Sequence, residues 1–159
     1  MREVLPLVCC NSFDVPAPGE RYAESSAVLA WLLGEEVGRP VREVLRRAEL
    51  VMRSDPTLVE CDRVLIRAVT LQEIDEAAAA DRWARLNVAA AHWHLWRVSS
   101  DIVDRARHPF PAEPVRTLDA IHLASALAAR SVVPRVELLS LDDRIRSAGV
   151  ELGFRLQPE

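Results

Sequence analysis

Lysine is absent from this chain, and cysteine, glycine and aromatic residues are scarce. The 159 residues include 20 basic residues, all of them arginine, but only 3 cysteines, 5 glycines and 5% aromatic residues. Cys9 and Cys10 are adjacent and Cys61 is isolated, which excludes a disulfide framework or a cysteine zinc site by spacing. This cysteine usage is typical of a reducing compartment, so we expect a cytoplasmic protein.

Long apolar runs are also missing. No run approaches the roughly 18 residues of a membrane span, so no membrane association is expected. The first ten residues resemble a secretory signal only vaguely, because their apolar run is short and is broken by Pro6. Prolines and turn residues continue to Gly19, and we therefore predict that residues 1–20 form an N-terminal extension. It is either a flexible tail or the product of a start site assigned too far upstream.

The net charge of −4 excludes a nucleic-acid binder of the basic-patch type. The exclusive use of arginine has two explanations. GC-rich codons are the simpler one, since alanine, valine and leucine are also abundant. Recognition of phosphate by guanidinium groups is the functional one. Bound metal ions would reverse the local field and allow even an acidic protein to act on RNA.

Short apolar segments alternate with amphipathic segments along the chain. Strands are predicted near residues 21–23, 50–52, 98–99, 136–141 and 153–155. Helices are predicted near residues 25–33, 39–50, 55–74, 75–97, 101–107 and 117–130, with a short one after residue 142. The alternation predicts an α/β fold with a short parallel sheet between layers of helices. The length favours one domain, which we place at residues 21–159.

Four short acidic segments carry most of the functional information. Glu24 follows the first predicted strand, and Asp142 follows the strand near residues 136–141. Glu60 lies in the second turn of a predicted helix, and Asp119 lies in the first turn of another. Sites of open parallel sheets form beyond the carboxyl ends of the strands, so we expect the four carboxylates to line one crevice. Each acid alone is more simply a helix-terminal or loop residue, but the four together favour a site.

Clustered carboxylates repel one another unless they share a cation. One or two Mg²⁺ or Mn²⁺ ions would turn this repulsion into coordination, and such ions activate water and neutralise a scissile phosphate. We therefore predict four catalytic acids, Glu24, Glu60, Asp119 and Asp142. Three of them, Glu24, Asp119 and Asp142, are the expected metal ligands, and Glu60 is a further ligand or positions the water. Ser26 and Ser140 would hold a carboxylate or metal-bound water.

The same segments resemble the acidic motifs of PIN-domain ribonucleases, above all the VapC toxins of type II toxin–antitoxin pairs. Residues 116–126 are the most specific part and resemble the third motif, while residues 139–144 resemble the fourth. Residues 57–60 and 23–29 resemble the second and first motifs, and the resemblance covers about residues 21–157. It implies a PIN-like three-layer sandwich, a Mg²⁺- or Mn²⁺-dependent endoribonuclease acting on RNA, and a cognate antitoxin.

The first motif departs from the family pattern, because Glu24 stands where the family has aspartate. The extra methylene moves the carboxylate, and Mg²⁺ demands near-ideal octahedral geometry. An alternative function is therefore a catalytically degenerate PIN-like module that binds protein or RNA without cleavage. A structure-specific DNA nuclease fits the same acids but lacks recognisable DNA-binding elements. If the site is active, Glu24→Asp is expected to keep or increase cleavage.

Two arginines follow Glu60 at successive helical turns. Arg63 and Arg67 are either solvated helix residues or the groups that grip RNA phosphate or acidic antitoxin side chains. A tryptophan-rich apolar face near Trp83 and Trp93 exceeds what a small sheet needs, so we expect a homodimer with a separate groove for the antitoxin.

Histidine contributes little to the predicted chemistry. His92 and His94, two residues apart on a predicted helix, point to opposite sides and cannot chelate one ion. His122 lies one turn after Asp119, and we interpret it as a structural hydrogen-bond partner of that acid.

Overall fold

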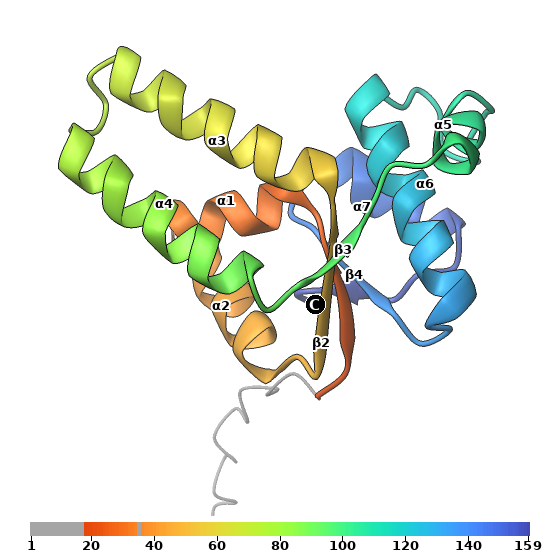
Figure 1. Cartoon of the computed structure of the whole chain (residues 1–159). Helices are drawn as coiled ribbons and strands as arrows, with labels where there is room; N and C mark the ends of the chain where they lie inside the picture. The colour runs from red at the N-terminus through yellow and green to blue at the C-terminus, as the bar shows by residue number, and fades with distance from the viewer. Residues whose placement is uncertain (1–17, 35) are drawn as a thin grey trace, which may run out of the picture.

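The computed structural model describes residues 18–34 and 36–159 (Figure 1). Five strands form one parallel sheet in the order β3-β2-β1-β4-β5. The strands are β1 (Glu20–Ala23), β2 (Leu50–Ser54), β3 (His94–Trp96), β4 (Glu137–Leu139) and β5 (Leu156–Gln157). The helices are α1 (Ser25–Leu33), α2 (Gly38–Arg47), α3 (Asp55–Thr70), α4 (Glu76–Ala90), α5 (Ser100–Ala106), α6 (Thr117–Val132) and α7 (Asp143–Glu151). Most of the predicted extension, residues 1–20, lies outside the described residues, as do Cys9 and Cys10.

Helices cover both faces of the sheet, which gives three layers. Helices α1 to α4 lie on one side and α5 to α7 on the other, with α3 and α4 forming a hairpin that projects from the body (Figure 1). Two apolar clusters match these layers: one includes Tyr22, Met52 and Leu138 against the second set of helices. The other includes Val51 and Leu139 against the first set. The three-layer α/β sandwich predicted from the sequence is confirmed. Among the described residues, no helix is both long enough and apolar enough to cross a membrane.

The order of the strands creates a switch point in the middle of the sheet. From β1 the chain adds β2 and β3 on one side, and then β4 and β5 on the other. The backbone N–H of Glu24 donates to the carbonyl of Leu139 at 3.0 Å, so the carboxyl ends of β1 and β4 lie side by side. Open parallel sheets bind their ligands at such a point.

Helices α1, α3 and α6 begin at residues 25, 55 and 117, as predicted from the sequence. Their N-cap residues are Glu24, Ser54 and Arg116, one position before each helix. In α1 the side chain of Glu24 makes the cap, because it accepts a hydrogen bond from the backbone of Ser26. A carboxylate at this position also interacts favourably with the helix dipole.

The predicted helix over residues 75–97 is wrong at its C-terminal end. Helix α4 stops at Ala90, and His94–Trp96 forms the edge strand β3 instead, paired with β2 from Met52 to Ser54. Trp93 packs on Trp31 with the ring centroids 6.2 Å apart. Pairing at the open edge of β2 therefore outweighs the helical periodicity of the local sequence. The strand predicted at residues 98–99 is absent, and Ser99 caps α5.

Candidate metal and catalytic site

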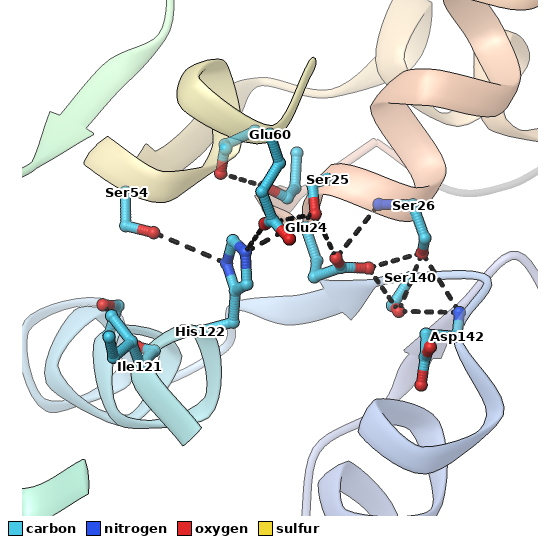
Figure 2. Close-up of polar contacts among 12 residues, drawn as sticks. Glu24, Ser25, Ser26, Ser54, Glu60, Ile121, His122, Ser140 and Asp142 are labelled. Carbon is cyan, nitrogen blue, oxygen red and sulfur yellow. Dashed lines mark hydrogen bonds and ion pairs between the residues drawn. The ribbon is translucent and has the colours of Figure 1, made fainter. Parts of the chain in front are cut away.

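The carboxylate of Glu24 lies at the switch point, and both of its oxygens accept hydrogen bonds (Figure 2). Its Oε1 accepts from Ser25 Oγ at 2.6 Å and from the Ser26 backbone at 3.0 Å. Its Oε2 accepts from Ser140 Oγ at 2.8 Å and from the hydroxyl of Ser26. The residue is only 3% exposed. The longer arm of glutamate thus spans from the start of α1 to the end of β4.

Ser26 and Ser140 also hold the chain around Asp142. Ser26 Oγ accepts from the backbone N–H of Leu141 at 2.9 Å and of Asp142 at 3.1 Å. Ser140 Oγ lies 3.1 Å from the Asp142 nitrogen. Asp142 in turn caps α7, because its Oδ1 accepts from the backbone of Arg144 and Ile145. The two predicted serines therefore connect Glu24 to the loop that carries Asp142.

Glu60 approaches Glu24 from α3 through a shared serine. Ser25 Oγ lies 2.7 Å from Glu60 Oε2, and His122 Nε2 lies 2.6 Å from the same oxygen. Ligand atoms of Glu24, Glu60 and His122 all lie within 4.8 Å of one another. Burial raises the pKa of Glu60, but hydrogen bonds from His122 and Ser25 outweigh it and leave that pKa below its usual value.

Asp119 differs from the other three acids. Its Oδ2 is buried and has no hydrogen-bond partner among the described residues. Burial raises the pKa of Asp119, and the negative charges of Asp142 and Glu24 raise it further, against an opposing effect of Arg116. An orphaned carboxylate oxygen in a negative field fits a bound divalent cation, which would supply the missing partner.

His122 forms a structural hydrogen bond, but it contacts Glu60 rather than Asp119, so the predicted partner was wrong. Two further residues of this region, Ser25 and Tyr22, were not predicted from the sequence. Ser25 bridges the two glutamates, and the Tyr22 hydroxyl lies 3.5 Å from His122 Nδ1. The adjacency of Ser25 to Glu24 was the only local signal for any of these contacts.

Arg63 and Arg67 lie further along α3 and are exposed. Neither forms an ion pair with a described residue, and both line a pocket of about 440 Å³ on this helix. The other residues that line the pocket are Val64, Ile66, Thr70 and Leu71. The pocket is therefore separate from the four acids.

Comparison with known proteins identifies the family. Residues 22–151 match the PIN domain. The chain is 34% identical over 133 residues to Ribonuclease VapC46 of Mycobacterium tuberculosis. The matched region covers 84% of this chain and 92% of that protein. This chain belongs to the VapC ribonucleases of the PIN-domain family. PIN nucleases depend on metal ions, and the carboxylate and histidine cluster of this chain fits that chemistry.

Solved structures of low sequence identity support the PIN fold. VapC20 of Mycobacterium tuberculosis, a sarcin–ricin loop cleaving toxin, superposes with a TM-score of 0.58 at 18% identity, covering 80% of this chain and 94% of its own. A toxin–antitoxin complex from Klebsiella pneumoniae gives a TM-score of 0.52 at 20% identity, covering 77% of this chain and 86% of its own.

Proposed function

We propose that this PIN domain is a metal-dependent endoribonuclease toxin that a cognate antitoxin neutralises. The observation that carries the proposal is the buried oxygen of Asp119, which has no partner among the described residues and is repelled by Asp142 and Glu24. Membership in the VapC ribonucleases supplies the reaction class.

The proposed metal ligands are Glu24, Asp119 and Asp142, with Glu60 as a further ligand or as the group that positions water. Mg²⁺ or Mn²⁺, when bound, would lower the pKa of a water molecule and neutralise charge on the scissile phosphate. Ser26 and Ser140 support this assignment, because they hold the Glu24 carboxylate and the backbone of Asp142. The catalytically degenerate alternative is not favoured, because four hydrogen bonds accommodate the longer arm of Glu24.

The partners and the location are further parts of the proposal. RNA is the substrate, an antitoxin is the protein partner, the chain forms a homodimer, and it acts in the cytoplasm. Arg63 and Arg67 would grip RNA phosphate, which is supported by their exposure on the helix that carries Glu60. Replacing both by alanine should lower the slope of RNA affinity against salt by about 2 if each contacts one phosphate. Light scattering tests the homodimer, and a monomer throughout the micromolar range would exclude it.

Single-turnover cleavage of a structured RNA pool tests the enzyme. We expect cleavage by the parent in Mg²⁺ or Mn²⁺, none in EDTA, and none by Asp119→Asn under either ion. Asp143→Asn is the matched control, because Asp143 is exposed and adjacent to Asp142 but takes no part in the cluster. Failure of the parent to cut with every divalent ion would support the non-catalytic module.

A further inference from the structure

A chain of buried polar groups runs beneath the carboxylates, with His122 at its centre (Figure 2). His122 is 1% exposed, and its Nε2 lies 2.6 Å from Glu60 Oε2. Its Nδ1 lies 3.5 Å from Ser54 Oγ and 3.5 Å from the Tyr22 hydroxyl. Tyr22 itself donates to Ser54 Oγ at 2.8 Å. The imidazole thus connects the carboxyl end of β2 to a catalytic acid on α3.

The chemistry of these groups decides which way the hydrogen bonds run. An ionised carboxylate can only accept, so the short contact with Glu60 requires a proton on His122 Nε2. Nδ1 is then free to accept, and Ser54, whose oxygen accepts the proton of Tyr22, is the hydroxyl that can donate to it. A single proton on Nε2 therefore satisfies the ring, and every donor from Tyr22 onward points toward Glu60.

Glu60 Oε2 has two hydrogen-bond partners among the described residues, and both come from other elements. Ser25 Oγ is shared with Glu24, so its single proton serves one glutamate at a time. His122 is the partner that is not shared between the two acids. Without it, only the shared hydroxyl of Ser25 would hold the Glu60 carboxylate.

We propose that His122 is a positioning residue, which donates from Nε2 to Glu60 and holds this carboxylate beside Glu24. Tyr22 and Ser54 hold the ring in the required tautomer. The consequence for catalysis rests on the proposed function, whereas the tautomer and the effect on metal affinity do not depend on RNA cleavage. Groups that orient a metal-binding side chain commonly contribute about 10- to 100-fold in affinity or rate.

The tautomer is tested on the full chain without metal. Long-range proton–nitrogen spectra of histidine-labelled protein, with His122 assigned by comparison with His122→Gln, report which nitrogen carries hydrogen. We expect hydrogen on Nε2. A neutral ring protonated at Nδ1 would overturn the proposal, because Nε2 would then be a candidate metal ligand rather than a donor.

Calorimetric titration with Mn²⁺ tests the consequence. His122→Leu should weaken binding about 10- to 100-fold, while His122→Gln, whose amide donates from nearly the same point, should stay within about threefold of the parent. His92→Leu is the control, because it removes an exposed histidine at the end of α4. Thermal scans of each variant separate lost affinity from lost fold.

A double-mutant cycle gives the sharpest result. In a Glu60→Gln background, His122→Leu should cause no further loss of Mn²⁺ affinity. Additive losses, or equal losses for His122→Gln and His122→Leu, would overturn the positioning role, as would a parent that binds no Mn²⁺. The parent could bind Mn²⁺ without cutting RNA, while His122→Leu binds Mn²⁺ more weakly. That result would support the positioning role and reject only the ribonuclease activity.

Discussion

Glu24 and Asp119 are both ligands of the proposed metal site, yet their surroundings are opposite. Both oxygens of Glu24 accept hydrogen bonds, from Ser25, Ser26 and Ser140. Asp119 keeps a buried oxygen for which the described part of the chain offers no donor. An anion surrounded by donors is stabilised by the protein itself, whereas an orphaned anion needs a proton or a cation. We infer that Glu24 builds the site and that Asp119 is the acid most responsive to metal.

The largest expected effect comes from Asp119→Asn. The amide keeps the shape but removes the charge that would attract the metal, so single-turnover cleavage should fall by at least about 100-fold. The melting temperature in EDTA should hold or rise, because repulsion by Asp142 and Glu24 disappears. If Asp119→Asn cuts RNA at the parental rate, Asp119 is not the acid most responsive to metal.

The next effect concerns Glu24→Asp. We expected this change to keep or increase activity when only the family pattern was considered, but the contacts of Glu24 reverse that expectation. A shorter arm cannot reach both Ser140 and the start of α1, so cleavage should fall by about 10- to 100-fold. Stability in EDTA should fall by about 1–2 kcal/mol, because serine hydroxyls that now donate to Glu24 would lose their acceptor. Urea unfolding measures this change in the free energy of unfolding. If Glu24→Asp is as stable as the parent, the backbone has adapted to the shorter side chain.

Metal binding should appear in the melting temperature. At a concentration near 100 times its dissociation constant, Mn²⁺ should stabilise the parent by about 2.7 kcal/mol, or about 5–10 °C. Asp119→Asn should lose most of this response, while Asp143→Asn should retain it. A thermal scan of the three proteins with and without Mn²⁺ is sufficient, and an unresponsive parent would contradict the metal site.

The smallest effect is the pH dependence of the metal-free protein. The pKa of Asp119 is raised in the fold, so the folded state holds this proton more tightly and stability falls as pH rises between the ordinary and raised values. The pKa of Glu60 is lowered, so its contribution is present above the ordinary value and is lost as pH falls. Urea unfolding in EDTA from about pH 3 to 7 should show the first trend vanish in Asp119→Asn and the second in Glu60→Gln.

The parts of the site that the sequence predicted depend on strand ends. Glu24 follows β1 directly and Asp142 follows β4 after two residues, so the general rule for parallel sheets was sufficient to bring them to one edge. The short strand β3 was missed because its pairing with β2 comes from a distant part of the chain. The contact between Glu60 and His122 joins residues 62 positions apart on α3 and α6, and no local pattern encodes that distance.

Glu24 and Asp142 have a second task, since each also begins a helix. In a genetic selection for cells that survive the proposed toxin, substitutions at these positions should remove the proposed activity and also destabilise the fold. Cellular proteases would then degrade the variant, because a loss of about 1–2 kcal/mol of folding stability changes protein abundance several-fold. Survivors altered at Asp119 should instead accumulate full-length, folded protein that still binds the proposed antitoxin. Immunoblots of survivors would therefore sort the acids of this site by abundance, without any measurement of catalysis.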